Sequence, residues 1–421
     1  MSLLQRNDTQ LQAWELVLLR SAHQMSLTEP QYRLICDRYE HLQGILSAGT
    51  HPLLQDAHIF PQGSMRLKTT LKPAPGAEGE LATIDADAVV WLPHAGSAEA
   101  ETVLQVIEER FRSGVRVEAP IEPLRRGIRI VYGDENPGFH IDVTPARSRS
   151  GNGALKGEGA LEVPDRETGW KASSPVPYAD WLAQVADQQI ALDGLVELAA
   201  RNREFSAEAT QDPLPDYVDY IDANPLRAAI KLLKRHRDEW ALRTRQVSVR
   251  PISAVLTTLA GLAYADIARE SGQGRRYRPV EAIMEIVARM PNFIGTGPAG
   301  YEVCNPTDRG ENFAEKWNRP NGEGERYRQA FQMWHAAAQQ DLRLGLQDLG
   351  TSVAFAQAMQ ERFGVSRSLV EETNRALPGN WTLPGRAPEV TANAARLSVL
   401  VGGTAAGPDP QAGIKPVDRL G

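Results

Sequence analysis

Hydrophobic and polar residues follow different periods in different parts of this chain. Over the first fifty-odd residues apolar side chains recur at helical spacing, and Thr28, followed by Glu29 and Pro30, marks the start of a helix. From about residue 57 the pattern changes to that of a mixed α+β region. Segments typical of strands are 82–92, 115–118, 127–132 and 139–143, and a helix is expected over 98–112.

The second half of the chain has mainly helical periodicity. Residues 146–175 are typical of loops, residues 178–375 of helices, and the end of the chain is rich in Pro, Gly and Ala. We therefore predict an α+β protein of two lobes. The expected units are N-terminal helices bracing both lobes (1–55), a catalytic lobe around one mixed sheet (56–175), a helical lobe (176–377) and a flexible C-terminal tail (378–421).

Composition restricts the class of protein. With 42 % hydrophobic and 24 % charged residues, the 421-residue chain can bury a large core, which excludes global disorder. It has no apolar stretch long enough to span a bilayer, and its first residues lack the core of a secretory signal. Only Cys36 and Cys304 are present, so a Cys-rich zinc site is excluded. We expect a reduced, cytoplasmic protein that is not membrane-bound, and a monomer.

The net charge of −7 argues against broad, sequence-independent binding of duplex nucleic acid, although it leaves local basic patches open. No nucleic-acid activator is therefore expected.

Three aspartates in apolar segments carry the main chemical signal. Asp85 and Asp87 are two residues apart in IDADAVV, so in a strand they would share one face, where burial and mutual repulsion disfavour their charged forms. A divalent cation such as Mg²⁺ removes that penalty. Asp142 lies in a second apolar segment, FHIDV, and His140 shares its face. If the two strands are neighbours, the three carboxylates can hold two metal ions for phosphoryl transfer; otherwise each aspartate has only local hydrogen bonds.

A short glycine-containing segment precedes the paired aspartates. Gly63-Ser64 follows a short strand and would open a helix, so that backbone N–H groups can approach a triphosphate and the Ser64 hydroxyl can donate to it. Such a pair is common at ordinary helix starts. Its position upstream of Asp85 and Asp87 makes it informative.

In the order Gly63-Ser64, Asp85-x-Asp87 and then Asp142, the sequence resembles the DNA polymerase β-like nucleotidyltransferase superfamily. Within it, FPQGSMRLKTT, IDADAVVWL and FHIDVTPA are similar to bacterial cyclic GMP–AMP synthase-like nucleotidyltransferases of anti-phage defence. IKLLKRHRD with RPISAVLTTLA resembles helical-lobe segments of that family and of 2′-5′-oligoadenylate synthases, and NPTDRGENFAEKW resembles a later block. The resemblance covers about residues 55–345. It implies a polymerase β-like lobe joined to an oligoadenylate synthase-like helical lobe.

The resemblance also implies roles for individual residues. Asp85 and Asp87 would bind Mg²⁺ with a donor triphosphate, and Asp142 would complete a site for two ions, which Mn²⁺ could also fill. Gln62, Gly63 and Ser64 would contact the nucleotide phosphates.

The helical lobe would supply further phosphate contacts. Lys234 matches the position that reaches the triphosphate, and Ser253 matches the hydroxyl contact that follows it. Without the resemblance, a basic run such as KLLKRHR is more often a solvated helix face. Lys231, one turn before Lys234, is expected to be structural or peripheral to the site.

Two positions depart from the family pattern. Twenty residues separate Ser64 from Asp85 because of the insertion KPAPGAEGE, and Lys68 stands where relatives often have glycine. Both changes concern the rim of the expected site rather than its metal ligands.

The function that the resemblance implies is the synthesis of a cyclic oligonucleotide second messenger from ATP and GTP, with release of pyrophosphate. A cyclic dinucleotide such as cyclic GMP–AMP is the first expectation. The alternatives are a cyclic trinucleotide, a linear oligonucleotide, and a catalytically silent nucleotide sensor.

The chain ends in Gly421, and such a flexible end usually has no special role. Some bacterial relatives are joined through their C-terminal residue to other molecules by a ubiquitin-transfer-like partner. Gly421 is therefore a candidate conjugation point for such a partner.

Overall fold

The structure is a computed structural model that describes residues 8–114, 119–133, 135, 137–149, 157–190, 224–377, 379 and 381–386. The segment 115–118, predicted as a strand, and Gly421, the candidate conjugation point, lie outside the described residues.

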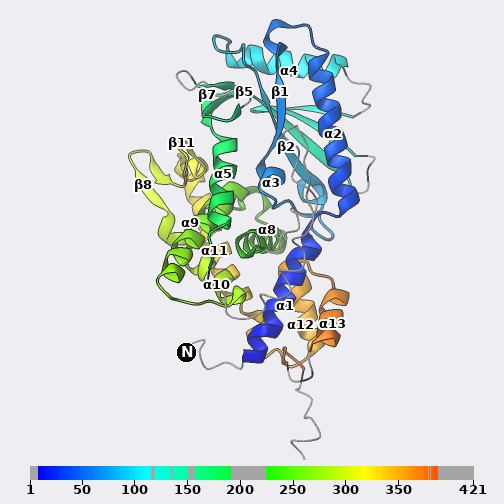
Figure 1. Cartoon of the computed structure of the whole chain (residues 1–421), viewed down its shortest axis with the longest axis vertical. Coiled ribbons are helices and arrows are strands. Elements are labelled where there is room, and N and C mark those ends of the chain that lie inside the picture. Colours follow the sequence, from blue (N-terminus) through cyan, green and yellow to red (C-terminus); the bar gives the residue numbers. More distant parts are fainter. Residues whose placement is uncertain are drawn as a thin grey trace, which may run out of the picture.

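One mixed sheet organises the upper part of the molecule (Figure 1). Its strand order is β1-β2-β5-β4-β3; β2 and β5 are parallel, and the other pairs are antiparallel. The strands are β1 (His58–Gln62), β2 (Ile84–Trp91), β3 (Ile121–Leu124), β4 (Gly127–Tyr132) and β5 (Phe139–Ser148). The two apolar segments that carry the aspartates are therefore adjacent central strands. The predicted α+β class is confirmed.

Two amphipathic helices cover this sheet. Helix α2 (Glu29–Ser47) begins after Thr28, whose backbone N–H donates to the Gln31 side chain at 2.9 Å. It packs along the strands, and α4 (Ala100–Gly114) crosses at one end (Figure 1). Apolar residues of both helices share a buried core with β2, β4 and β5.

A single buried helix organises the lower part of the molecule. In α8 (Pro225–Thr244) every residue from Leu226 to Ala241 is buried, including the charged ones, because neighbouring elements surround it (Figure 1). These elements include α1 (Asp8–Met25), which belongs to the same core. Among the described residues, further helices of this lobe are α5 (Pro175–Ala186), α9 (Ser253–Gly272), α10 (Pro279–Arg289), α11 (Glu323–Asp341), α12 (Ser352–Phe363) and α13 (Arg367–Ala376).

The segment expected to be a loop contains a β-hairpin. Strands β6 (Leu161–Asp165) and β7 (Gly169–Ser173) pair with each other, and β6 pairs with the end of β5. The sequence did not reveal them because polar residues interrupt the apolar alternation. Several of these polar residues are instead satisfied by ion pairs, as at Asp165.

Short elements connect the larger ones. The Gly/Pro-rich stretch forms two ribbons: β8 (Gly295–Gly297) with β9 (Gly300–Glu302), and β10 (Cys304–Asn305) with β11 (Asp308–Asn312). Helix α3 (Gly63–Arg66) follows β1, and 3₁₀ turns lie at η2 (Pro52–Leu54), η3 (Gly79–Ala82), η6 (Val247–Val249), η7 (Met290–Phe293), η8 (Glu315–Asn318) and η9 (Leu344–Leu346).

Part of the predicted tail is packed against the helical lobe. Leu383 is buried in the core of that lobe, and Arg386 donates to the carbonyls of Asn374 and Leu377 at 2.7 and 3.1 Å. The described residues 381–386 therefore continue the folded lobe. The sequence suggested otherwise because Pro and Gly dominate this stretch.

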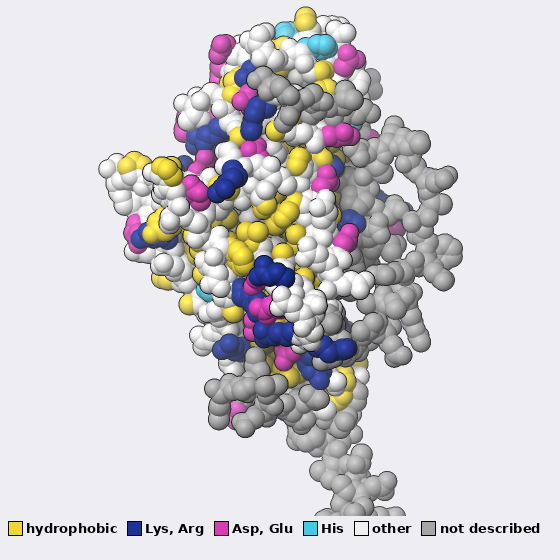
Figure 2. All heavy atoms as spheres, turned by 60° about the vertical axis from the view of Figure 1, so that its left-hand side comes forward, with side chains coloured by type: hydrophobic (Ala, Val, Ile, Leu, Met, Phe, Trp, Pro, Cys, Tyr) yellow, Lys and Arg dark blue, Asp and Glu magenta, His cyan; other side chains and the backbone are white. Residues whose placement is uncertain are grey.

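On the face shown in Figure 2, basic and acidic side chains are interspersed with hydrophobic ones rather than gathered into one basic surface. Within the described residues, no helix is both long and apolar enough to cross a bilayer.

Trp14 joins α1 to the end of the helical lobe, and its loss should destabilise the protein. Its indole is fully buried, donates to the Leu342 carbonyl at 2.8 Å and packs edge-on against Phe355. We expect Trp14→Ala to lower the free energy of unfolding by about 3–5 kcal/mol in urea titrations. Val353→Ala, at a 67 % exposed position, is the matched control and should change it by less than about 0.5 kcal/mol. Equal stability of the two variants would contradict this role.

Candidate active site

The parallel pairing of β2 and β5 brings the predicted carboxylates together. Asp87 lies opposite Asp142, and Asp85 lies opposite His140. The Asp85 carboxylate is 2.9 Å from Nε2 of His140, whose other ring nitrogen is 3.1 Å from the Thr83 hydroxyl. One ligand atom each from Asp85, His140 and Asp142 lie within 4.8 Å of one another. His140, which sequence reasoning placed only near the site, therefore contacts a candidate metal ligand directly.

Gly63 lies against the second aspartate. Its φ is +56°, and a Cβ at this position would be 2.1 Å from Oδ2 of Asp87, so both the backbone conformation and the space require glycine. The strand before it ends at Gln62, which pairs with Asp87. Ser64 follows in α3, and its hydroxyl accepts a hydrogen bond from Thr70 at 2.9 Å. The Gly63-Ser64 turn thus places backbone N–H groups and a hydroxyl beside the carboxylates.

The electrostatics of the aspartates differ. Burial, together with the charges of Asp85 and Asp142, raises the pKa of Asp87 well above its ordinary value. Burial also favours a higher pKa for Asp85, but the hydrogen bond and charge of His140 outweigh it and hold that pKa below its ordinary value. The Asp85 side chain faces a cavity lined by both lobes, so 63 % of its surface is accessible there although the surrounding protein limits its hydration.

These groups fit a divalent cation. The oxygen-rich donor set suits a hard ion such as Mg²⁺, and a cation would relieve the repulsion that, with burial, raises the pKa of Asp87.

Two further residues hold the carboxylates, and the sequence alone did not identify them. Arg129 lies opposite Asp142 in the β4–β5 pair, and its guanidinium forms a bidentate ion pair with that carboxylate at 2.7 and 2.8 Å. From α2, the Tyr39 hydroxyl donates to the backbone carbonyl of Asp87. The available signal for Arg129 was its place in an apolar strand, where a cation needs a partner.

A cavity of about 470 Å³ joins residues from both lobes. Among its lining residues are four of the predicted site residues, Ser64, Asp85, Lys234 and Ser253. Asp87, Asp142, Gln62 and Gly63 lie in the adjoining strands and turn rather than in this lining. The volume is within the range of pockets that bind small molecules.

The two lysines of α8 point to different surroundings. The Lys234 ammonium donates to the Thr69 carbonyl at 2.9 Å, close to the Gly63-Ser64 turn. Burial lowers the pKa of Lys234 to about 8. Lys231 instead donates to the hydroxyl of Ser26, between α1 and α2, and is absent from the cavity lining. The hydroxyl of Ser253 accepts from Arg237 at 3.0 Å.

The insertion between Ser64 and Asp85 forms part of the cavity wall. Lys72, Pro73, Ala74 and Leu81 line the cavity, and the Lys72 carbonyl accepts a hydrogen bond from Arg235 of α8 at 2.6 Å. Lys68 has φ +60°, the left-handed conformation that glycine adopts most easily. A glycine would adopt this conformation without strain, which agrees with the glycine that the family resemblance led us to expect there.

Comparisons with known proteins agree with this architecture. Residues 22–185 match the family described as the Second Messenger Oligonucleotide or Dinucleotide Synthetase (SMODS) domain. The c-di-GMP synthase of Roseivirga ehrenbergii is 26 % identical over 266 residues, which are 62 % of this chain and 61 % of the relative. The chain thus spans about 61 % of the length of that curated relative.

Solved structures share the fold of both lobes. The CD-NTase CdnG of Bradyrhizobium diazoefficiens, in complex with GTP, superposes with a TM-score of 0.61 at 20 % identity, covering 86 % of this chain and 98 % of that one. E. coli MS115-1 CdnC with ATP superposes with a TM-score of 0.51 at 13 % identity, covering 83 % of this chain and 98 % of CdnC. The cyclic AMP-GMP synthase DncV of Vibrio cholerae, with a nonhydrolyzable GTP, gives 0.50 at 16 % identity, covering 82 % and 94 %. The chain therefore shares the fold of these three proteins.

We predict that Asp87→Asn raises the melting temperature when divalent cations are absent. Because the folded-state pKa of Asp87 is raised, the wild type loses stability as pH rises from about 4 through that raised pKa, and the amide removes this loss. Melting curves from pH 5 to 9 should therefore be flatter for the variant, and Mg²⁺ should stabilise it less than the wild type. Asp180→Asn, at an exposed position on α5, is the control. A variant less stable than the wild type at pH 8 would contradict the predicted repulsion.

Proposed function

We propose that the chain, whose residues 22–185 match the SMODS family, is a nucleotidyltransferase that joins purine nucleoside triphosphates into a cyclic oligonucleotide second messenger. The observation that carries the proposal is the alignment of Asp85, Asp87 and Asp142 beside the Gly63-Ser64 turn. Few other reactions need three clustered carboxylates next to a phosphate-binding turn.

The proposed reaction is an in-line displacement. A ribose hydroxyl attacks the α-phosphorus of a nucleoside triphosphate, a new P–O bond forms, pyrophosphate leaves and the hydroxyl proton is released. Two Mg²⁺ ions, held by Asp85, Asp87 and Asp142, would supply charge neutralisation for the phosphates and the attacking oxygen. The backbone at Gly63 and Ser64 would orient the phosphates, with Gln62 at the strand end beside them. Arg129 keeps Asp142 in place from the neighbouring strand.

The helical lobe would complete the phosphate site. Lys234 lies in the cavity with its ammonium near Thr69, and Ser253 begins α9 on the same cavity. Burial in this low-dielectric setting strengthens the attraction of an ammonium for a triphosphate. We therefore assign Lys234 and Ser253 to nucleotide binding.

The product we propose is a cyclic dinucleotide that contains guanine, made from GTP alone or from ATP and GTP. The sequence segments favour cyclic GMP–AMP, whereas the name of the Roseivirga ehrenbergii relative favours cyclic di-GMP. Incubation with ATP, GTP or both, followed by phosphatase and mass spectrometry, separates these products from cyclic trinucleotides. A phosphatase-sensitive product would be linear, and no product would favour a nucleotide sensor. A role in anti-phage signalling is part of the same proposal.

We predict that the double variant Asp85→Asn/Asp87→Asn loses synthesis by at least about a thousandfold while remaining folded. Two amides cannot hold the metal ions that neutralise the phosphates. Product formation with Mg²⁺ and labelled nucleotides measures the loss, and circular dichroism checks the fold. Asp180→Asn should retain wild-type activity. Synthesis by the double variant at the wild-type rate would remove the aspartates from the site.

We predict that Lys234→Met raises the apparent KM for nucleotide about tenfold, whereas Lys231→Met changes it by less than threefold. Both substitutions keep a long apolar side chain at a buried position of α8, but only Lys234 lines the cavity. Because the pKa of Lys234 is about 8, the wild-type KM should also rise above pH 8 as the ammonium deprotonates, and this rise should be absent in Lys234→Met. Equal KM values for the two variants at pH 7 would exclude the assignment.

A further inference from the structure

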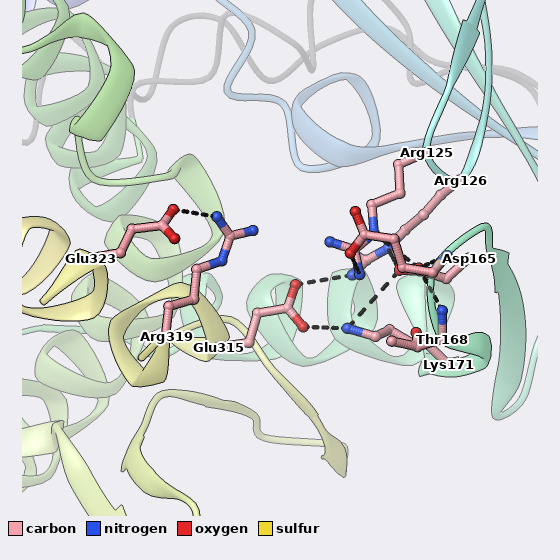
Figure 3. Close-up of polar contacts among 9 residues, drawn as sticks. Arg125, Arg126, Asp165, Thr168, Lys171, Glu315, Arg319 and Glu323 are labelled. Atoms are coloured by element: carbon pink, nitrogen blue, oxygen red, sulfur yellow. Dashed lines mark hydrogen bonds and ion pairs between the residues drawn. The ribbon is translucent and has the colours of Figure 1, made fainter. Parts of the chain in front are cut away.

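An ion-pair bridge centred on Glu315 joins the late block to the catalytic lobe (Figure 3). Glu315, in η8, accepts hydrogen bonds from Arg126 at 2.9 Å and from Lys171 at 2.5 Å. Arg126 lies in the turn between β3 and β4, and Lys171 lies on β7. The carboxylate of Glu315 therefore contacts two residues that lie 189 and 144 positions earlier in the sequence.

The catalytic-lobe side of this bridge is fixed by a buried carboxylate. The Asp165 side chain is fully buried, and it accepts hydrogen bonds from Arg125 at 2.9 Å and from Arg126 at 3.0 Å. The backbone N–H groups of Glu167 and Thr168 also donate to it. Burial opposes the charge of Asp165, but these donors outweigh burial and hold its pKa far below the ordinary value. Arg126 is thus held rigidly where it meets Glu315.

The residue after Glu315 faces the cavity of the proposed active site. Lys316 lines this cavity together with Tyr327, and its ammonium lies 5.7 Å from the centre of the Tyr327 ring. Among the residues that the structure describes, this ammonium has no hydrogen-bond acceptor and no ion-pair partner.

Other cations of the cavity already have acceptors. Lys234 donates to the Thr69 carbonyl, Lys72 to the Gln24 carbonyl, and Arg237 to Ser253. An ammonium left without a partner in a cavity is the group most available to an anionic ligand.

The surroundings of Lys316 also favour an anion. Burial lowers the pKa of Lys316, and the charge of Arg319 lowers it further, in part offset by Glu315. The charges of Arg126 and Arg250 also lower the pKa of Lys316. A phosphate placed there would relieve this excess of positive charge.

We propose that Lys316 binds a phosphate group of a nucleotide in the cavity, and that Glu315, through its ion pairs with Arg126 and Lys171, positions it. This inference rests on the proposed function for the identity of the nucleotide. The contact with phosphate is direct for Lys316 and indirect for Glu315. It adds a contact from the late block to those assigned to Ser64 and Lys234.

The first test measures equilibrium binding rather than synthesis. A nonhydrolysable GTP analogue, inorganic tripolyphosphate and guanosine are titrated with Mg²⁺ into the full chain. We expect Lys316→Ala to lower the affinity for the analogue and for tripolyphosphate about tenfold and to leave the affinity for guanosine unchanged. The salt dependence of binding should also become shallower. Lys316→Arg should restore most of the affinity. Loss of guanosine binding, or an unchanged affinity for the analogue, would overturn the phosphate contact.

The second test concerns Glu315 and depends on the sign of the effect. If only charge mattered, Glu315→Gln would remove a negative group near Lys316 and strengthen phosphate binding. If Glu315 positions Lys316, the same variant should weaken it, by about threefold. Glu323→Gln, which breaks the neighbouring ion pair with Arg319 (Figure 3), is the matched control and should change affinity by less than twofold. Tighter binding by Glu315→Gln would refute the positioning role.

A double-mutant cycle separates positioning from general stability. If Glu315 acts through Lys316, then Glu315→Gln should have no further effect in the Lys316→Ala background. Additive losses would show an independent, structural role and overturn the proposal. These binding results are independent of synthesis. If the wild type binds the analogue through Lys316 but forms no product, the proposed reaction fails while this contact stands.

Discussion

The alignment of Asp87 with Asp142 across two parallel strands is the constraint on which the site depends. It places two carboxylates side by side in a largely buried sheet, where their charges repel each other. Burial and this repulsion raise the pKa of Asp87, and Asp142 forms an ion pair with Arg129. A divalent cation, as the proposed function requires, would offset the remaining negative charge.

The helical lobe supplies the complementary charge. Helix α8 is buried over sixteen consecutive residues, yet it carries Lys231, Lys234, Arg235 and Arg237 within them. Burying so many cations is costly unless each has acceptors. Backbone carbonyls from the Ser64–Asp85 segment provide two of them, at Thr69 and Lys72. The insertion that departs from the usual spacing thus helps to hold the two lobes together.

The sequence alone predicted much of the fold and the candidate site. The strand β4 and the start of β5 agreed with the structure, because apolar alternation marks strands with one buried face. The proximity of Asp85, Asp87 and Asp142 depended on one assumption, that their strands are neighbours, and the structure supports it. The hairpin of β6 and β7 was missed because its polar residues form ion pairs rather than an apolar face.

The remaining site residues could not be predicted because they depend on contacts distant in sequence. The apolar strand around Arg129 indicates that it needs a partner, but only the register with Asp142 shows which one, and Tyr39 donates to the Asp87 carbonyl from a helix 48 residues earlier. Lys316 lies in the late block NPTDRGENFAEKW, but its place in the cavity depends on contacts with the sheet, such as that of Glu315 with Arg126, which the sequence does not show.

Different elements place the charged residues that line the cavity. Strand register fixes Asp85 in the sheet, whereas Lys234 of α8 and Lys316 of η8 line the cavity from the helical lobe. A polyphosphate with bound metal matches this separation, since it offers anionic oxygens to the cations and metal charge to the carboxylates. Backbone hydrogen bonds between strands set the place of Asp85, whereas side-chain ion pairs of Glu315 hold the segment that carries Lys316. Under the proposed function, substitutions in η8 would therefore alter nucleotide binding and leave the three aspartates in place.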